Sequence, residues 1–192
     1  PFAKWSQVAR LTRCIFTITF NFKKQLMEAV QIIEKYQLLP HPEGGWYKET
    51  YRSEATIPAE ALPKSFSGSR SMSTAIYFLM EAENFSAFHR IKSDECWHFY
   101  AGGTLEIYII DTEGTLSVVK LGNQIDKGEC FQYVVPANCW FASKPAEGIS
   151  FSFVGCTVSP GFDFQDFELA NGTTLSLQHP QHAMLINALC RS

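Results

Sequence analysis

The chain combines one helical stretch near its start with a long series of strand-like stretches. In residues 23–38 the apolar side chains recur at helical spacing, at Leu26, Ala29, Val30, Ile33 and Tyr36. This pattern predicts one amphipathic helix that ends before Pro40. A Pro-Glu-Gly-Gly turn follows, and residues 46–52 alternate like a strand. Residues 180–190 return to a short helical pattern.

From Ser71 onward, apolar and polar positions alternate in short runs separated by turns. The runs predict strands at residues 73–80, 85–91, 96–101, 104–111, 115–122, 130–136, 149–158 and 162–169. Many short strands with glycine-containing turns and no intervening helix are typical of a sandwich or barrel. We therefore predict an all-β protein. Residues 53–70, rich in Ser, Pro, Gly and Ala, predict a long surface loop.

Composition narrows the classes of function. Of 192 residues, 46% are hydrophobic, which allows a sizeable core without disulfides or a structural metal. The net charge of −3 argues against binding nucleic acid through a basic surface, so we expect no nucleic-acid partner. The chain also lacks an uncharged apolar run long enough to cross a bilayer, so we expect no membrane partner.

The cysteines indicate a reducing environment. The six cysteines form no Cys-x-x-Cys pair, which argues against zinc-ribbon and thioredoxin-like sites. Several lie in apolar strand-like runs, where a free cysteine behaves as a small hydrophobic residue. We expect reduced thiols and a cytoplasmic, intracellular location.

The first residues differ from the rest. They carry Lys4, Arg10, Arg13, Lys23 and Lys24, and no acidic residue precedes Glu28. An organelle-targeting segment, residues foreign to the native protein and a disordered extension all fit this composition. We divide the chain into an extension at residues 1–22 and a single domain at residues 23–192.

The middle of the chain holds a recognisable constellation. His89, Glu95 and Gly102 are followed later by Gly128 and by Pro136-Ala137-Asn138. This spacing resembles the two motifs of the cupin superfamily, in which closely spaced histidines, a glutamate and a third histidine are placed around glycines. The resemblance implies a cupin double-stranded β-helix, a jelly-roll barrel, here with an N-terminal helix and a short C-terminal helix.

A closer resemblance is to one uncharacterised cupin family. It is carried by three blocks: LLPHPEGGWYKETYRS, SAFHRIKSDECWHFYAGG, and VPANCWFAS followed by VGCTVSPGFDFQDFEL. It covers roughly residues 26–190. A family without a settled reaction implies the fold but not the activity.

The metal ligands of the superfamily are incomplete here. His89 and Glu95 occupy ligand positions, whereas Ile91 and Phe141 stand where the superfamily has histidines. Strand alternation places His98 on the face opposite Glu95. The other histidines, His41, His179 and His182, lie in turn or terminal segments. Because a catalytic transition metal usually needs three protein ligands, we favour a site without a metal or another cofactor.

Metal-free acid–base chemistry is the alternative that we favour. Burial and a neighbouring carboxylate push the pKa of an imidazole in opposite directions, which can leave it near neutrality. By resemblance to metal-free cupin epimerases, His89 is the candidate base, oriented by Glu95 or Asp94. The candidate acids are Tyr47, Tyr77 and Tyr133.

These residues predict a pocket for a small molecule. We expect it to be lined by His89, Glu95, Trp97, Gln132 and Trp140, with Tyr47, Arg52 and Arg70 near its mouth and Tyr77 as a further contact. The arginines either bind an anionic substrate or pair with Asp163, Asp166 and Glu168. An isomerase or epimerase, a non-catalytic ligand-binding or sensor protein, and a metal-dependent oxygenase remain open, as does a purely structural His89. Resemblance to cupins also implies a homodimer.

Overall fold

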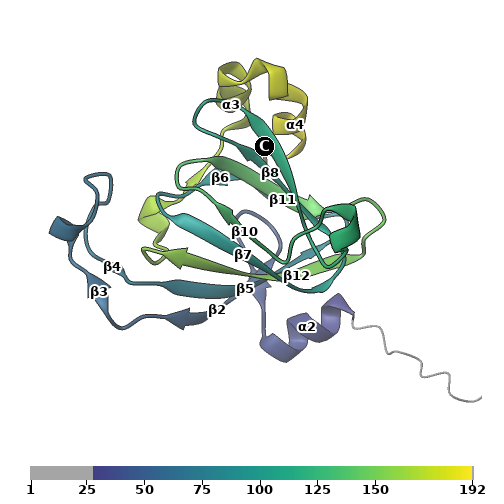
Figure 1. The fold of residues 1–192 in the computed structure, drawn as a ribbon, viewed down its shortest axis with the longest axis horizontal. Coiled ribbons are helices and arrows are strands. Elements are labelled where there is room, and N and C mark those ends of the chain that lie inside the picture. Colours follow the sequence, from purple (N-terminus) through teal and green to yellow (C-terminus); the bar gives the residue numbers. More distant parts are fainter. Residues whose placement is uncertain (1–27, 192) are drawn as a thin grey trace, which may run out of the picture.

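Two antiparallel sheets face each other in the computed structural model, which describes residues 28–191. The first sheet has the order β1 (Leu39–Pro40), β2 (Trp46–Arg52), β5 (Thr74–Glu81), β12 (Phe151–Ser159), β7 (Asp94–Gly102) and β10 (Gln132–Val135). The second has the order β13 (Glu168–Leu169), β6 (Ser86–Arg90), β11 (Trp140–Pro145), β8 (Leu105–Ile110) and β9 (Leu116–Leu121) (Figure 1). The predicted all-β jelly-roll barrel is confirmed.

Alternation along the strands explains how the barrel is filled. In β8, Leu105, Ile107 and Ile109 point into the core between the sheets. Ile110 instead joins a second apolar cluster on the outer side of the same sheet. In β7 the alternation places Trp97 inside the core, fully buried. Because successive side chains of a strand point to opposite faces, one strand can contribute to two separate apolar layers.

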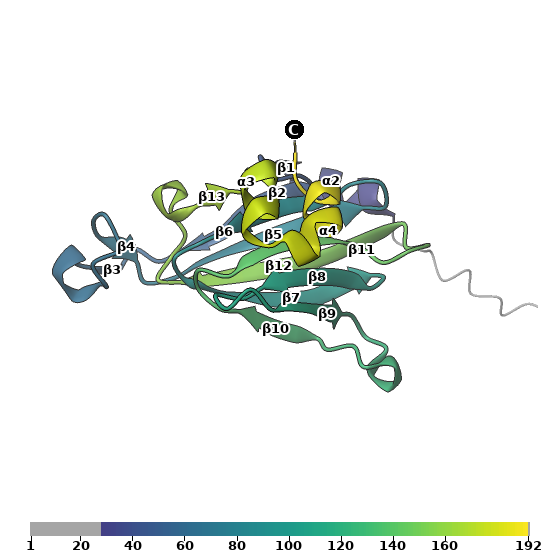
Figure 2. The ribbon, with the colours of Figure 1, turned by 90° about the horizontal axis from the view of Figure 1, so that it is seen from above.

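Helices cover the outer face of each sheet. Helix α2 (Ala29–Tyr36) packs Ile32 against Leu79 and Phe153 of the first sheet. Helices α3 (Gly172–Gln178) and α4 (Ala183–Ala188), joined by the 3-10 turn η4 (Pro180–His182), cover the second sheet. They lie on the side of the barrel away from α2 in Figure 1 and face the viewer in Figure 2. Both faces of a covered strand can then be apolar, as in β12.

Several segments differ from the sequence prediction, among them helix α3, which was not predicted. The helix predicted over residues 23–38 is confirmed between Ala29 and Tyr36, while residues 23–27 and the extension at residues 1–22 lie outside the described residues. Strand β11 was not predicted. Residues 162–169, predicted as a strand, instead form the 3-10 helix η3 (Phe164–Asp166) before the short β13. The cause is local, because the Asp163 side chain accepts the backbone N–H of Gln165 and caps this turn.

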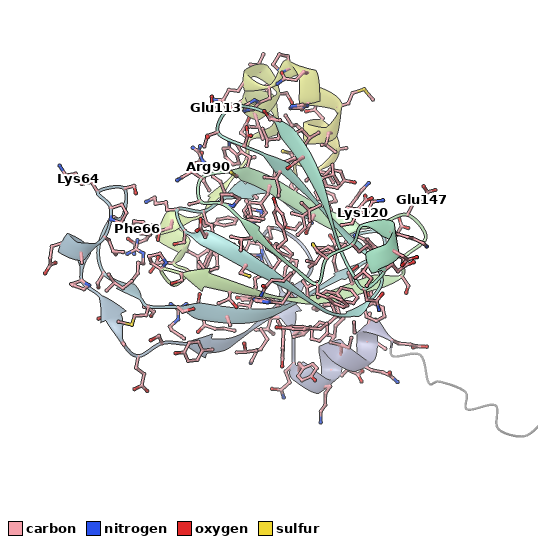
Figure 3. All side chains as sticks on the ribbon, viewed as in Figure 1. Lys64, Phe66, Arg90, Glu113, Lys120 and Glu147 are labelled. Atoms are coloured by element: carbon pink, nitrogen blue, oxygen red, sulfur yellow. The ribbon has the colours of Figure 1, made fainter. Side chains whose placement is uncertain are left out.

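The predicted loop at residues 53–70 is an arm with some structure of its own. It contains β3 (Thr56–Ile57) and the 3-10 turn η1 (Ala59–Ala61), and it returns through β4 (Arg70–Ser71), which pairs with β3. The arm projects from one end of the barrel in Figure 1, and Lys64 and Phe66 lie on it in Figure 3.

No helix in the described part of the chain is long and apolar enough to cross a bilayer.

Gly155 allows one close approach on the outer face of the first sheet. A Cβ atom at this position would lie 2.6 Å from Tyr100 Cε2, well inside van der Waals contact. We expect Gly155→Ala to lower the free energy of unfolding by about 1–3 kcal/mol, measured by urea denaturation. In a Tyr100→Ala background the same change should cost much less. An equal cost in both backgrounds would contradict this explanation.

Candidate functional site

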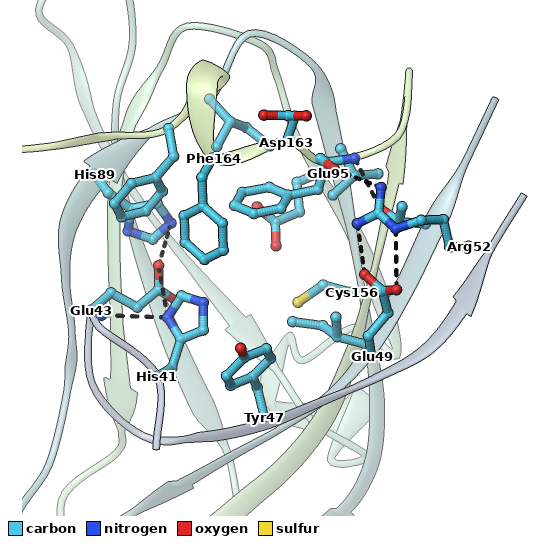
Figure 4. A pocket seen from close by; sticks show the side chains of 16 residues that line it. His41, Glu43, Tyr47, Glu49, Arg52, His89, Glu95, Cys156, Asp163 and Phe164 are labelled. Atoms are coloured by element: carbon cyan, nitrogen blue, oxygen red, sulfur yellow. Dashed lines mark hydrogen bonds and ion pairs between the residues drawn. The ribbon is translucent and has the colours of Figure 1, made fainter. Parts of the chain in front are cut away.

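A pocket with a volume of about 480 Å³ lies at one end of the barrel, where it brings several ionisable side chains together. This volume lies in the range of small-molecule sites. Strands β2, β5, β6, β7 and β12 contribute to its wall, together with the turn after β1 and the segment around η3 (Figure 4). Its lining consists of His41, Glu43, Tyr47, Glu49, Arg52, Thr74, Ile76, His89, Ile91, Glu95, Cys156, Val158, Phe162, Asp163, Phe164 and Phe167.

The turn at residues 41–45 brings two polar side chains into the pocket. Gly44 and Gly45 have φ angles of +118° and +74°, which residues other than glycine rarely adopt. A Cβ atom at Gly45 would also lie 2.8 Å from the Leu79 carbonyl oxygen. The two glycines therefore fix the tight turn that directs His41 and Glu43 inward.

Glu43 and His89 share one proton. His89 Nδ1 lies 2.7 Å from the Ala87 carbonyl oxygen, which can only accept, so Nδ1 carries a hydrogen. His89 Nε2 lies 3.1 Å from Glu43 Oε2, and one further proton must lie between these two atoms. Burial raises the pKa of Glu43 and lowers the pKa of His89. Both shifts favour a neutral pair in which the Glu43 carboxylic acid donates to His89 Nε2.

Glu95 is the group best placed to exchange protons near neutral pH. It is buried and lines the pocket from β7. Burial raises the pKa of its carboxyl group from 4.5 to about 7, against the opposing influence of nearby His89 and with a further increase from Glu43. The thiol of Cys156, on the paired strand β12, lines the pocket beside it and lowers its pKa slightly. A carboxyl group with this pKa is half ionised at neutral pH, as a general acid or base requires.

His41 and Tyr47 form the wall opposite the η3 segment. The backbone N–H of Glu43 donates to His41 Nδ1 at 3.3 Å, so the other ring nitrogen carries the hydrogen in a neutral His41. Burial lowers the pKa of His41, which favours this neutral form. The ring of Tyr47 meets the His41 ring edge-on at 4.6 Å between centroids.

The rim of the pocket carries an exposed ion pair. Arg52 Nε and Nη2 donate to the two carboxylate oxygens of Glu49 at 3.1 and 2.7 Å. Arg52 Nη1 donates to the Phe162 carbonyl oxygen at 3.1 Å. Asp163 and the largely exposed Phe164 complete this side of the rim (Figure 4).

A buried ion pair connects the η3 segment to the end of the arm. Arg70 Nε and Nη2 donate to Asp166 at 2.6 and 2.8 Å, and both side chains are almost fully buried. Lys92 Nζ lies 3.2 Å from the same carboxylate. Burial would raise the pKa of Asp166, but the hydrogen bonds from Arg70 and Lys92 hold it below its usual value. The pair therefore fixes the position of residues 162–167 on the pocket wall.

Four of the residues expected at the site line the pocket: His89, Glu95, Tyr47 and Arg52. The expected orientation of His89 by Glu95 or Asp94 needs a correction. Its side-chain partner is Glu43, and Asp94 instead accepts the backbone N–H of Ala137.

The other five expected residues lie outside the pocket lining. Arg70 is bound to Asp166. Tyr77 packs on the outer face of the first sheet, against Tyr36 and Phe153, and Gln132 lies 2.9 Å from His98 in an exposed contact. Trp97 fills the core between Phe78 and Phe141, and Trp140 lies under the Arg90 guanidinium. Tyr133, the remaining candidate acid, packs against the core, so Tyr47 is the candidate tyrosine that reaches the pocket.

Sequence reasoning missed several lining residues. His41 was set aside as a turn residue, yet it lies in the pocket, as do Glu43, Glu49, Cys156 and Asp163. The available signal was the HPEGGW block, whose paired glycines mark a constrained turn beside two ionisable side chains.

The residues do not fit the metal site of cupins. Phe141 packs against His89 with the rings tilted and 4.1 Å between their centroids, in the place of a histidine ligand. Both ring nitrogens of His89 are already hydrogen-bonded or paired. Within residues 28–191, no group of three or more His, Cys, Asp or Glu side chains is arranged to hold a metal ion. The metal-free interpretation stays a prediction.

Comparison with known proteins places this chain in a family. The family model described as "Cupin superfamily (DUF985)" matches residues 30–170. An uncharacterised protein of Saccharomyces cerevisiae is 32% identical over 151 residues, with 74% of this chain and 75% of that protein covered.

Two solved structures are similar over most of the chain. A hypothetical protein from Leishmania major is 34% identical, with a TM-score of 0.79, and covers 86% of this chain and 100% of its own. A protein from Shewanella oneidensis is 40% identical, with a TM-score of 0.77, and covers 86% of this chain and 99% of its own. The chain therefore belongs to the cupin superfamily, in the family described as DUF985.

Proposed function

We propose that this cupin is a metal-independent acid–base enzyme, isomerase- or epimerase-like, that moves a proton at the carbon next to a carbonyl group of a small molecule. The observation that carries the proposal is Glu95, a buried carboxyl group in a pocket of about 480 Å³ whose pKa is raised to about 7. At neutral pH such a group can accept a proton as the carboxylate and donate it as the carboxylic acid, because both forms are populated.

The neighbouring residues suggest a division of roles. Glu95 takes the proton from the carbon and becomes a carboxylic acid, while the electron pair of the broken C–H bond forms an enolate. The neutral His41 ring and the Tyr47 hydroxyl are candidate donors to the enolate oxygen. Return of the proton by Glu95 to the same face regenerates the substrate, whereas delivery of a proton to the opposite face by a second donor, for which Tyr47 is the candidate, gives the epimer. His89, with its proton shared with Glu43, orients this wall and moderates the pKa of Glu95.

Deuterium exchange tests the proposal without knowledge of the natural substrate. A panel of keto-sugars and other enolisable carbonyl compounds is incubated with the protein in D₂O, and deuterium incorporation next to the carbonyl is followed by proton NMR. The protein is prepared without nickel resin, and its metal content is measured by elemental mass spectrometry. We expect enzyme-dependent exchange that survives treatment with a chelator.

His89→Ala provides the matched variant. We expect it to slow exchange while the ligand still raises the melting temperature, because the pocket remains but Glu95 loses its neighbour. Ligand-dependent stabilisation with no exchange for any compound would instead support a non-catalytic binding or sensor protein. Exchange that is lost on chelation and restored by a metal would support a metal-dependent reaction.

The homodimer and the cytoplasmic location expected from the sequence stay predictions. Exposed strand edges such as β10 are compatible with association, since an edge strand presents unpaired backbone groups. Light scattering after size-exclusion chromatography measures the mass in solution and tests the dimer. A mass of 21.7 kDa for this chain would contradict it.

A further inference from the structure

The charges that line the pocket are unbalanced. Four carboxyl groups face it, those of Glu43, Glu49, Glu95 and Asp163. Among the described lining residues, Arg52 is the one permanently charged cation, because burial holds His41 and His89 toward their neutral forms. Even with Glu43 protonated through its pairing with His89, the carboxylates of Glu49 and Asp163 outnumber Arg52, so the pocket is acidic as a whole.

The Arg52 guanidinium is already engaged. Two of its nitrogens donate to Glu49 and the third donates to the Phe162 carbonyl oxygen. A phosphate or carboxylate on a ligand would have to compete with Glu49 for the same planar face. Arg70, the other arginine considered for anion binding, is committed to Asp166. The pocket therefore offers an anionic ligand no uncompensated positive charge.

Aromatic rings surround the acidic rim. Phe162 and Phe167 each pack edge-on against Phe164, at 5.1 and 6.1 Å between centroids. Tyr47 lines the opposite wall. The faces of aromatic rings attract cations, most strongly where water is partly excluded. Carboxylates and aromatic faces together are the surroundings that suit a positively charged group.

We propose that the pocket selects an amine-bearing carbonyl compound, with its ammonium group beside Asp163 at the rim and its carbonyl end toward Glu95. This inference rests on the proposed function, because the carbonyl end is the one on which Glu95 acts. It assigns Asp163 as a residue that determines specificity, and Glu49 as the residue that neutralises the neighbouring Arg52. Substrates that carry phosphate, diphosphate or carboxylate groups are disfavoured.

A charge-matched series tests the proposal. Aminoacetone, hydroxyacetone and pyruvate share a small carbonyl skeleton and differ in charge, and glucosamine, glucose and glucose 6-phosphate form a larger series. Dissociation constants are measured at pH 7 by saturation-transfer NMR titration. We expect each amine to bind at least about tenfold more tightly than its anionic counterpart, with the neutral compound between them. The preference should fall as salt is added.

Charge variants of the rim provide the sharper test. Glu49→Gln and Asp163→Asn should each weaken amine binding by about threefold to tenfold. Asparagine at position 163 keeps the acceptor that caps η3, so the local fold is maintained. Arg52→Gln should have the opposite sign and strengthen amine binding. Glu147→Gln, on the turn between β11 and β12 and outside the pocket lining, is the matched control and should change nothing (Figure 3).

Two results would overturn the inference. One is an anion that binds as tightly as its amine counterpart, and the other is a series in which no member binds at millimolar concentration. The proposed function is decided separately by deuterium exchange. Exchange of pyruvate but not of aminoacetone would remove the inference and leave the acid–base function intact. Selective amine binding without exchange would remove the acid–base function and leave the preference for amines intact.

Discussion

Replacing Glu95 with glutamine is expected to lower the turnover of exchange by about 10²–10⁴-fold, the usual contribution of a positioned general base. Glutamine keeps the size and hydrogen-bonding ability of the side chain but cannot accept a proton from carbon. The dissociation constant of the ligand should therefore change little. Turnover and binding are measured separately, by NMR exchange and by titration.

The pH profile should report the same group. In the wild-type protein, kcat/KM should rise with pH and level off above about 7, because the carboxylate is the active form and the pKa of Glu95 is about 7. The residual activity of Glu95→Gln should lack this rise. A profile that is unchanged by the substitution would assign the catalytic base to another residue.

The same substitution should stabilise the protein at alkaline pH. The folded protein holds the Glu95 proton more tightly than the unfolded chain. Below pH 4.5 Glu95 is protonated in both states and does not lower stability, and the folded state then loses stability as the pH rises from 4.5 to about 7. The ionised, buried carboxylate then costs about 3 kcal/mol. At pH 8 we expect Glu95→Gln to melt about 5–10 °C above the wild type. At pH 4 the two proteins should melt together, and Glu147→Gln is the control at both values.

The second large effect is expected at the buried ion pair. Arg70→Ala leaves the Asp166 carboxylate buried with Lys92 as its remaining charged partner, and this should lower the free energy of unfolding by about 3–5 kcal/mol. Urea denaturation measures the loss. Ligand affinity should fall as well, because the pair holds residues 162–167 against the pocket.

Arg52→Ala is the matched control for Arg70. Arg52 lies at the same end of the pocket, but its ion pair with Glu49 is exposed. We expect its removal to lower the free energy of unfolding by at most about 1 kcal/mol. Replacing both partners of the buried pair with apolar residues, as in Arg70→Met with Asp166→Leu, should recover much of the loss. Equal costs for Arg70→Ala and Arg52→Ala would show that the burial of the pair has no energetic consequence.

The strands could be predicted because their alternation is a local property of the sequence. Strands β5, β8 and β9 lie within one or two residues of the predicted ranges. Strand β11 carries the small residues Ala142 and Ser143 and ends at Pro145, so its short pattern resembles a loop. Its strand character comes from pairing with β6 and β8, which no local pattern records.

The pocket was predictable only in part, because alternation distinguishes two faces without saying which face is hollow. Glu95 and Trp97 point to the same side of β7, but Trp97 fills the core and Glu95 reaches the cavity. Tyr77 lies on the opposite face of β5, where α2 makes an equally apolar layer. The partnership of Glu43 with His89 joins positions far apart in the sequence, and only the folded sheet brings them together.

Two parts of the pocket are held in different ways. Glu95 and Cys156 form its floor and lie on the hydrogen-bonded strands β7 and β12. One side of the rim is formed by Phe162, Asp163 and Phe164, on the segment that the Arg70–Asp166 pair holds in place. Residues 162–164 contribute no ladder pairs and can vary without moving the strands. Substitutions at residues 162–164 would therefore change one side of the rim while the strands that carry Glu49, Glu95 and Cys156 stay in place, so the charge of the rim can be altered separately from the group proposed to move the proton.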